Sequence, residues 1–386
     1  MIDLKQYGYT ETEAPPAGLV PGRITELQRE QYTVITERGE VAAVLKGSFY
    51  HGAQTREEYP SVGDFVLLQH NENGASRIAA LLPRRSKFSR ADFSGHAAGY
   101  VKTILEQVVA TNFDYVFILS SLNWDFKVNR IMRYLTQTRR SGGQPVIVLT
   151  KADLVEDFAA PLADVRQAAL GVPVHAVSAH TGFGLDGLDA YLKPEKTVVF
   201  LGMSGVGKSS LLNALMEQEV MAVKAIREDD SRGRHTTTHR QLFMLPSGAM
   251  VIDTPGMREL GLFGADEGIS VGFADVEALF SQCRFGDCRH QTEPGCAVLQ
   301  AIASGSLPHE QWERYKQQKK ESRYAEDKSA YFAERRAWGK DIAKWSKERR
   351  RVCGVSGFIS ACFQKTAFTK FSIVFAQIVH DFFIIR

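Results

Sequence analysis

The chain has 386 residues, of which 44% are hydrophobic and 24% are charged, and its formal net charge is +3. This length exceeds one ordinary hydrophobic core, so about two to four domains are expected, and the small net charge excludes a uniformly basic nucleic-acid-binding chain. No apolar run reaches the roughly 18 residues that a spanning helix needs, and the N-terminus lacks the pattern of a signal peptide. We therefore expect a globular, cytoplasmic protein without a membrane partner.

The N-terminal part of the chain is predicted to form an all-β domain. Residues 1–20 are treated as an extension, and residues 21–83 alternate apolar and polar side chains around turns at Gly39 and Gly74. Several short strands with glycine turns are typical of a small barrel such as an OB-fold, and an SH3-like barrel would give much the same pattern. Residues 84–95 are basic with little periodicity and are interpreted as a linker.

Residues 96–270 have the pattern of an α/β domain. The segments DYVFILSS, PVIVLT, VPVHAVSA and TVVFLG are short apolar strands, and the segments VNRIMRYLTQTRR and KSSLLNALM are helical. Continuous apolar strands that alternate with helices are typical of a parallel sheet covered on both faces.

A phosphate-binding loop follows the strand TVVFLG. Residues 202–209 fit the pattern G-x-x-x-x-G-K-[ST] between a strand and a helix. In such a loop backbone N–H groups converge on phosphate oxygens, the lysine reaches the β- and γ-phosphates, and the serine hydroxyl ligates Mg²⁺. Lys208 is thus also a catalytic candidate. The predicted phosphate-binding residues are Gly202, Met203, Ser204, Gly205, Val206, Gly207, Lys208, Ser209 and Ser210.

Two segments ahead of this loop predict recognition of guanine. Thr150, Lys151 and Asp153 follow a strand and match the pattern [NT]-K-x-D, while Ser178 and Ala179 follow the next strand. An aspartate can accept from both the N1–H and the 2-amino group of guanine, whereas adenine offers no such pair of donors. Together the two segments favour GTP over ATP.

Two further segments follow the loop. Asp253 and Gly256 belong to a D-x-x-G element, which holds Mg²⁺ through water and senses the γ-phosphate. The segment GRHTTTHRQ occupies the position of switch I, the first nucleotide-sensing loop. Thr237 is the preferred ligand that completes the Mg²⁺ coordination, and Thr236 and Thr238 are its rivals.

Residues 271–312 contain a cluster of potential metal ligands. Cys283, Cys288, His290 and Cys296 supply three thiolates and one imidazole, the number that a closed tetrahedral zinc site needs. One structural Zn²⁺ is therefore predicted, and metal-type cysteine spacing favours a reducing compartment. Residues 313–352 are predicted to form a basic helix, and residues 353–386 an atypical apolar tail to which no function is assigned.

The motif order is rotated relative to an ordinary G domain, in which phosphate loop, switch I and switch II (the DTPG element) precede the base-reading segments. The order TKAD, SA, GMSGVGKSS, TTT, DTPG, with a small β-domain before it and a Cys/His cluster after it, resembles the RsgA (YjeQ) family. These are circularly permuted GTPases of small-ribosomal-subunit biogenesis. The resemblance covers about residues 20–320.

This resemblance implies an enzyme that hydrolyses GTP to GDP and phosphate, with turnover stimulated by the 30S subunit during its late assembly. It implies 16S rRNA as a partner, zinc in the Cys/His cluster and Mg²⁺ with GTP, and we expect a monomer. Met257 stands where many GTPases carry a water-orienting glutamine, so intrinsic hydrolysis should be slow. The resemblance favours His235 as the water-orienting group, and His239 suits the role less because it begins the following strand.

Basic and aromatic residues in two places could contact RNA. Lys46, Phe49, Tyr50, His51 and Arg56 cluster between predicted strands beside the basic segment 84–90, and residues 334–351 combine Trp338 and Trp345 with many Lys and Arg side chains. The alternatives are a packed barrel edge and a helix that packs on its own protein. For the whole chain, the rival functions are a P-loop metabolite kinase or ATPase, and a nucleotide-gated RNA-binding protein with negligible hydrolysis.

Overall fold

The computed structural model describes nine stretches of the chain, which are residues 1–11, 13–28, 31–47, 49, 56–92, 105–123, 126–221, 240–254 and 266–326. All helices and strands named below lie in these stretches. Short 3₁₀ helices occur at Leu4–Tyr7, Arg56–Glu58, Ala152–Leu154, Asp186–Leu188 and Phe280–Gln282. In this described part of the chain, no helix is both long and apolar enough to cross a membrane.

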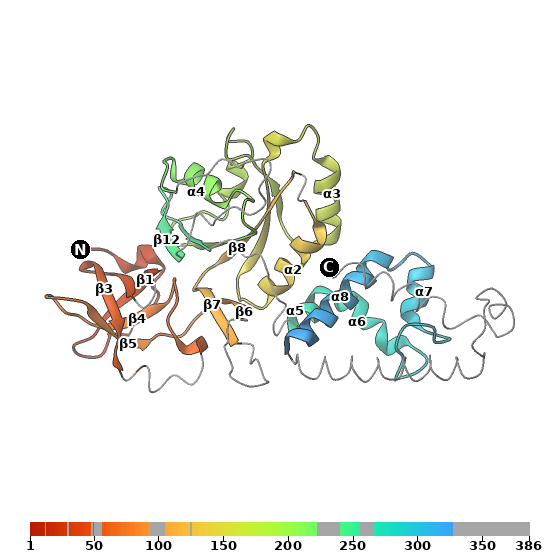
Figure 1. The fold of residues 1–386 in the computed structure, drawn as a ribbon, viewed down its shortest axis with the longest axis horizontal. Coiled ribbons are helices and arrows are strands. Elements are labelled where there is room, and N and C mark those ends of the chain that lie inside the picture. Colours follow the sequence, from red (N-terminus) through yellow and green to blue (C-terminus); the bar gives the residue numbers. More distant parts are fainter. Residues whose placement is uncertain are drawn as a thin grey trace, which may run out of the picture. The chain divides into compact units, whose positions relative to one another are not determined.

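The N-terminal domain is a five-stranded barrel (Figure 1). Its strands run in the order β1-β2-β3-β5-β4, and β4 pairs back to β1. All neighbours are antiparallel except β3 and β5, which are parallel. This Greek-key order is that of an OB-fold and not of the SH3-like alternative. The strands are β1 (Val20–Gln28), β2 (Gln31–Thr36), β3 (Gly39–Leu45), β4 (Phe65–Gln69) and β5 (Ser76–Leu81).

The segment after the barrel is more ordered than its sequence suggests. The sequence predicts a linker over residues 84–95, but this segment contains strand β6 (Lys87–Asp92), which pairs antiparallel with β7 (Leu105–Thr111). The phenyl ring of Phe88 is 1% exposed and belongs to the main core. The prediction of an aperiodic linker is therefore wrong, because β6 gains its structure from a strand that lies beyond residue 104.

The central domain contains a six-stranded sheet in the order β10-β9-β8-β11-β13-β12. Five strands are parallel, and β12 is antiparallel at one side. Separate apolar clusters lie around Ile118 and Val199 and around Phe117 and Phe200, as expected for a sheet that is covered on both faces. The strands are β8 (Tyr115–Ser121), β9 (Gln144–Thr150), β10 (Val174–Ala176), β11 (Thr197–Leu201), β12 (Arg240–Met244) and β13 (Met250–Asp253). The helices are α2 (Val128–Arg139), α3 (Ala159–Ala168) and α4 (Lys208–Met216).

The sequence positions of these strands are rotated around the centre of the sheet. Strand β11, which leads into the phosphate loop, lies between β8 and β13. The strands β8, β9 and β10 on one side precede it in the chain, whereas β12 and β13 on the other side follow it. Because the five parallel strands share a direction, the loops after β8, β9, β10, β11 and β13 meet at one edge of the sheet.

The barrel and the central domain are joined through their backbones and through buried polar side chains. Strand β1 pairs with β12 at Leu27 and Arg240, which makes the two sheets continuous. Arg23 of β1 is fully buried and donates to the Tyr7 and Asn112 carbonyls at 2.6 and 2.8 Å and to the Thr197 hydroxyl at 3.0 Å. Its burial lowers the pKa of the guanidinium to about 9, and the neighbouring Arg85 adds to this.

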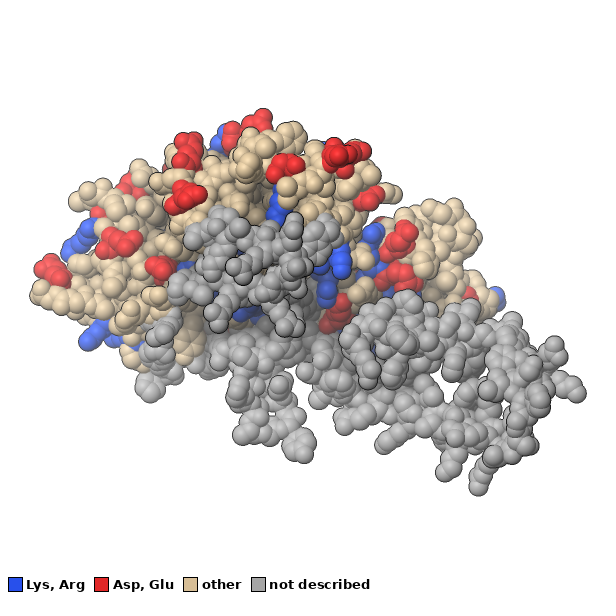
Figure 2. Space-filling view, turned by 45° about the horizontal axis from the view of Figure 1, so that its top comes forward, with Lys and Arg blue, Asp and Glu red and all other residues tan. Residues whose placement is uncertain are grey.

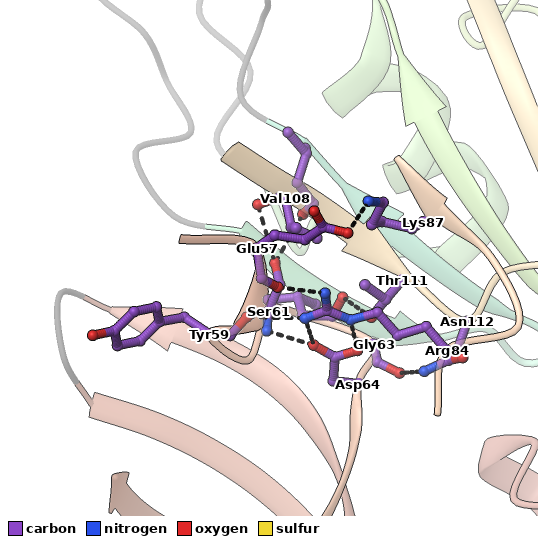
Figure 3. A network of polar contacts seen from close by, with 12 residues as sticks. Glu57, Tyr59, Ser61, Gly63, Asp64, Arg84, Lys87, Val108, Thr111 and Asn112 are labelled. Atoms are coloured by element: carbon purple, nitrogen blue, oxygen red, sulfur yellow. Dashed lines mark hydrogen bonds and ion pairs between the residues drawn. The ribbon is translucent and has the colours of Figure 1, made fainter. Parts of the chain in front are cut away.

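A second arginine, Arg84, forms an ion pair with the buried Asp64 beside this junction (Figure 3). Arg84 donates from Nε and Nη2 to the two carboxylate oxygens of Asp64, at 2.8 and 2.7 Å, and from Nη1 to the Glu57 carbonyl at 2.7 Å. The Asp64 side chain is fully buried, and such bidentate pairs fix orientation as well as position. Asn112 donates to the Gly63 carbonyl at 3.1 Å and accepts from the Arg85 N–H at 2.9 Å.

We expect the substitution Gly63→Ala to destabilise this junction. Gly63 has φ +94°, and a Cβ atom there would lie 2.2 Å from the Thr111 carbonyl oxygen. Left-handed strain and overpacking together should lower the free energy of unfolding by about 2–5 kcal/mol. Gly18→Ala is the matched control, since Gly18 has φ +79° with open space around it, and it should cost only about 1–2 kcal/mol. Denaturant unfolding of both variants measures the difference; equal losses would contradict the predicted clash.

The C-terminal described part is a small helical unit. It comprises α5 (Asp266–Gly272), α6 (Ala274–Ala278), α7 (Ala297–Ala303) and α8 (His309–Glu326). A single apolar cluster runs from Ile269 to Tyr315, so this unit begins before and ends after the range 271–312 expected from the sequence. The polar helix expected at 313–352 begins earlier, at His309, and its part beyond 326 and the tail lie outside the described residues.

Candidate nucleotide site and metal centre

The phosphate loop connects the central strand β11 to helix α4, as its sequence pattern requires. Gly205 and Gly207 have φ +83° and +97°, values that side chains rarely tolerate, and Gly207 is the N-cap of α4. A Cβ atom at Gly202 would lie 2.7 Å from the carbonyl oxygen of Leu119 in β8. The loop therefore turns tightly from the sheet into a helix N-terminus, which is a favourable place for an anion.

Lys208 occupies the first residue of α4 and folds back over the loop. It is 8% exposed, and its ammonium donates to the carbonyls of Gly202 and Met203 at 2.9 and 2.8 Å. Burial lowers the pKa of Lys208 to about 8, although the nearby charge of Asp253 acts in the opposite direction. This ammonium is thus held inside the curve of the loop, in the place where phosphate oxygens are expected.

Two base-side segments meet at the edge of the sheet. The exposed Asp153 in the 3₁₀ helix after β9 accepts from the hydroxyl of the buried Ser178 at 2.5 Å, and this hydroxyl accepts from the Thr181 N–H at 3.2 Å. Thr150, at the end of β9, donates from its hydroxyl to the Val206 carbonyl of the phosphate loop at 2.5 Å. The predicted base-reading and phosphate-binding segments are therefore bonded directly to each other, with Lys151 after Thr150 in a left-handed conformation, φ +61°.

Asp253 ends strand β13, directly beside the phosphate loop. It lies opposite Phe200 of β11, and it is 1% exposed. The next residue, Thr254, is fully buried and donates from its hydroxyl to the Phe200 carbonyl at 2.6 Å. This bond, which the D-x-x-G pattern does not reveal, fixes the start of the segment that leaves the sheet. A hydroxyl residue directly after the aspartate is the sequence signal that could have indicated it.

Several predicted site residues lie outside the described part of the chain. These are the remaining members of the D-x-x-G element and the switch I segment with its two histidines: Gly256, Met257, His235, Thr236, Thr237, Thr238 and His239. Tyr50, His51, Trp338, Trp345, Cys353 and Cys362 are also outside it. Of the described barrel candidates for RNA contact, Lys46 is exposed, whereas Phe49 packs partly against the barrel core.

The four predicted zinc ligands converge in the helical unit. One ligand atom from each of Cys283, Cys288, His290 and Cys296 lies within 4.8 Å of the others. His290 Nδ1 is 3.5 Å from Cys283 Sγ and 3.4 Å from Cys296 Sγ, and these two sulfurs are 4.0 Å apart. Tetrahedral ligands with Zn–S and Zn–N bonds of about 2.3 and 2.0 Å would be about 3.5–3.8 Å apart. The cluster thus fits a four-coordinate zinc ion.

The surroundings favour the ligand forms of two of the four side chains, His290 and Cys283, whereas burial raises the pKa of the Cys288 thiol to about 11. Burial lowers the pKa of His290, which keeps the imidazole neutral. Although burial acts in the opposite direction, backbone N–H groups of Ala297 and Val298 lower the pKa of the Cys283 thiol. Phe280 stacks on the His290 ring at 4.4 Å between centroids. Neutral imidazole and thiolate are the forms that bind zinc.

The fold and these sites define a P-loop GTPase with circularly permuted strands, an OB-fold barrel before it and a Cys₃His helical unit after it. Residues 81–263 match the family model for the RsgA GTPase. The chain is 44% identical over 327 residues to "Small ribosomal subunit biogenesis GTPase RsgA 2" of Lactiplantibacillus plantarum, a match that covers 84% of this chain and 90% of that relative. It is 41% identical to "Small ribosomal subunit biogenesis GTPase RsgA" of Syntrophotalea carbinolica, covering 87% of this chain and 93% of the relative.

Two crystal structures have the same fold. "YjeQ from Thermotoga maritima" has a TM-score of 0.55 and 26% identity, and the match covers 78% of this chain and 96% of that structure. "YloQ, a circularly permuted GTPase" has a TM-score of 0.51 and 24% identity, with 79% of this chain and 96% of that chain covered. The chain belongs to the RsgA GTPase family.

Proposed function

We propose that this protein is a GTPase that binds the small (30S) ribosomal subunit and acts in its late assembly, hydrolysing GTP to GDP and phosphate. The hydrolytic half of the proposal is carried by the bond between Thr150 and the Val206 carbonyl, which joins a guanine-type segment to a phosphate loop in one site. The ribosomal half is supported by the names of relatives that match more than four fifths of the chain.

In this proposal each segment contacts a different part of GTP. The backbone N–H groups of residues 202–210 and the Lys208 ammonium bind the phosphates. Asp153, oriented by the Ser178 hydroxyl, accepts from the guanine N1–H and 2-amino groups, with Thr150, Lys151 and Ala179 completing the base side. A base without these donors would leave the Asp153 carboxylate unpaired.

The residues that would hold Mg²⁺ beside the phosphates are Ser209, Asp253 and Thr237, of which Ser209 and Asp253 are described. Ser209 lies in α4 after β11, Asp253 ends the adjacent strand β13, and both offer the oxygen ligands that Mg²⁺ prefers. When bound, Mg²⁺ neutralises charge on the β- and γ-phosphates. Lys208 contributes positive charge at the same oxygens.

The chain order suggests how nucleotide state reaches the helical unit. Residues 255–265 connect β13 and Asp253 directly to α5, which belongs to the same apolar cluster as the metal centre. We infer that γ-phosphate contacts in this segment bias the placement of the helical unit, as in other switches whose loops are ordered by the γ-phosphate. Zinc at Cys283, Cys288, His290 and Cys296 would be structural, since four protein ligands leave no position open.

The remaining partners and the location follow from the same proposal. 16S rRNA is the expected RNA partner, and the barrel with Lys46 is one candidate surface for it. We propose that the protein is monomeric and cytoplasmic.

The decisive experiment measures steady-state GTP turnover with and without purified 30S subunits. We expect slow turnover for the protein alone and a large stimulation by 30S subunits, with ATP neither binding nor being hydrolysed. Turnover that 30S subunits leave unchanged would remove the ribosome from the proposal, and equal use of ATP would favour a different P-loop enzyme.

We expect His235→Ala to reduce the 30S-stimulated turnover by about 10²-fold or more, since positioned acid–base groups contribute 10²–10⁴-fold. GTP affinity should remain nearly unchanged, because the imidazole would act on the attacking water and not on the ground-state nucleotide. Single-turnover hydrolysis with 30S subunits measures the effect, with His309→Ala as a control at an exposed site away from the nucleotide segments. Unchanged stimulated turnover would remove His235 from the mechanism.

Loss of one zinc ligand should unfold the helical unit locally. We expect Cys296→Ser to lower the bound zinc from about one per chain to none, because structural sites need all four ligands. Metal content and the near-UV signal of Trp312, which lies 5.8 Å from the His290 ring, report the change. GTP affinity should persist, since the nucleotide site lies in the central domain. A variant that keeps full zinc content would contradict this assignment.

A further inference from the structure

A basic cavity lies between helix α2 of the GTPase domain and helix α8 of the helical unit. Its volume is about 230 Å³. Helix α2 contributes one wall and helix α8 the other, and the lining residues are Lys127, Asn129, Arg130, Arg133, Arg314, Gln317, Gln318 and Glu321. None of them belongs to the proposed nucleotide or metal site. Figure 2 shows Lys and Arg side chains gathered where the GTPase domain meets the helical unit.

The lining carries a large surplus of positive charge. It contains four cationic side chains and one carboxylate, and this carboxylate, Glu321, is already occupied by Arg133 at 2.5 Å and by the Gln317 amide at 3.3 Å. Arg133 Nε is buried and has no hydrogen-bond partner in the described part of the chain. Burial lowers the pKa of Arg314, against the opposing effect of Glu310. Partly desolvated cations of this kind interact strongly with an anion that enters.

The backbone adds to this positive potential. Lys127 is the N-cap of α2, no side chain among the described residues caps the helix there, and the first turn contains no acidic residue. The positive end of the dipole of a 12-residue helix therefore lies beside the cavity. Amides of Asn129 and Gln317 supply neutral donors next to the guanidinium groups. Guanidinium and amide groups around a partly open cavity suit a phosphate group of an extended polyanion.

The cavity has fixed walls. The Thr136 hydroxyl of α2 donates to the buried Gln318 side chain of α8 at 2.7 Å, and the Arg133–Glu321 pair joins the same two helices. The two helices and Arg133 are thus held in place before a ligand arrives, which reduces the entropy lost on binding.

We propose that this cavity between α2 and α8 binds phosphate groups of the RNA backbone of the small subunit. The proposal rests on the proposed function, and it names a contact surface formed jointly by the GTPase domain and the helical unit. RNA bound there would contact both α2 and α8. Helix α2 follows β8, whose end lies at the nucleotide edge of the sheet, and α8 belongs to the helical unit that follows switch II. Binding of RNA and the nucleotide state would then be coupled through the α2–α8 contact.

The test is the double variant Lys127→Gln/Arg314→Gln, with Arg166→Gln/Lys193→Gln as a control that removes two exposed charges elsewhere on the GTPase domain. Binding to purified 30S subunits is measured with a non-hydrolysable GTP analogue across a range of salt concentrations. Each lost phosphate contact should reduce the slope of log affinity against log salt by about 1. The ratio of wild-type to variant affinity should therefore fall about tenfold between about 50 and 200 mM salt.

Three control measurements and one further variant make the outcome specific. GTP affinity, zinc content and thermal stability should match the wild type, and the single variant Lys127→Gln, at an exposed side chain, should show about half the change in slope. An unchanged slope, or an equal change in the Arg166/Lys193 control, overturns the proposal. A loss of affinity that is independent of salt also overturns it, because it would indicate contact with a ribosomal protein. The proposal is likewise overturned if the variant no longer binds pyrophosphate but still binds 30S subunits as the wild type does. Failure of the wild type itself to bind 30S subunits would instead refute the proposed function.

Discussion

Asp153→Asn is expected to weaken GTP binding by about 10⁴-fold and to create measurable affinity for XTP. In the proposed site the carboxylate accepts from two guanine donors, and an amide would place its own N–H₂ group against one of them, which would leave donors unpaired. Xanthine carries a carbonyl where guanine carries the 2-amino group, so the amide can donate to it. The Ser178 hydroxyl can still donate to the amide oxygen of the variant, because this bond needs only an acceptor.

Displacement of a fluorescent nucleotide by GTP, XTP and ATP measures these affinities. Asp164→Asn is the matched control, since Asp164 is an exposed carboxylate on α3 of the same domain, and it should leave GTP affinity within about twofold. If Asp153→Asn bound GTP as well as the wild type does, Asp153 would not contact the base. A loss of GTP affinity without any gain for XTP would indicate that the variant had only damaged the loop.

The order of the central sheet is predictable because each buried strand leaves a strong local pattern. Val198, Val199 and Phe200 are consecutive and all fully buried, although neighbouring side chains on a strand point to opposite faces. Such a run requires apolar cover on both sides of the sheet, and the alternation with helices then requires parallel strands. The permuted fold is therefore readable from motif order and apolar runs alone.

The junction between barrel and GTPase domain is not predictable in the same way. Arg23 has the local pattern of a solvent-facing strand residue, yet it is fully buried because acceptors from several distant segments converge on it. The sequence places Arg84 in a linker, yet this residue forms a bidentate pair with the buried Asp64. In both cases the partners lie far apart in the chain, and no short-range periodicity records them.

The candidate nucleotide site also combines features that local motifs predict with features that only tertiary contacts create. Sequence motifs identify Asp153, Ser178 and Thr150 because the spacing of each motif is local. The bond from Thr150 to the Val206 carbonyl joins residues 56 positions apart, and no motif indicates it. The basic cavity between α2 and α8 is likewise a product of tertiary packing, because its cations come from two separate helices.

GTP affinity is expected to fall about tenfold as the pH rises from about 7 to about 9, because the pKa of Lys208 in the nucleotide-free protein is lowered to about 8. Below this pKa the ammonium is already charged and, in the proposed site, can bind the phosphates without taking up a proton. Above it the free protein has lost the proton, whereas a triphosphate beside the amine favours the charged form. Binding must then take up one proton, so affinity decreases with increasing pH and not with decreasing pH.

The affinity should be measured by calorimetry in buffers of different ionisation enthalpy, which also reports the number of protons taken up. Uptake should rise from near zero at about pH 7 toward one at about pH 9. Lys208→Arg is the informative control, because the arginine guanidinium stays charged throughout this pH range. The larger guanidinium group is expected to weaken GTP binding at every pH. Its affinity should therefore be lower but nearly independent of pH. An equally steep decrease in Lys208→Arg would assign the titration to another group, and Lys208 would then be a fixed charge at the phosphates throughout the physiological range.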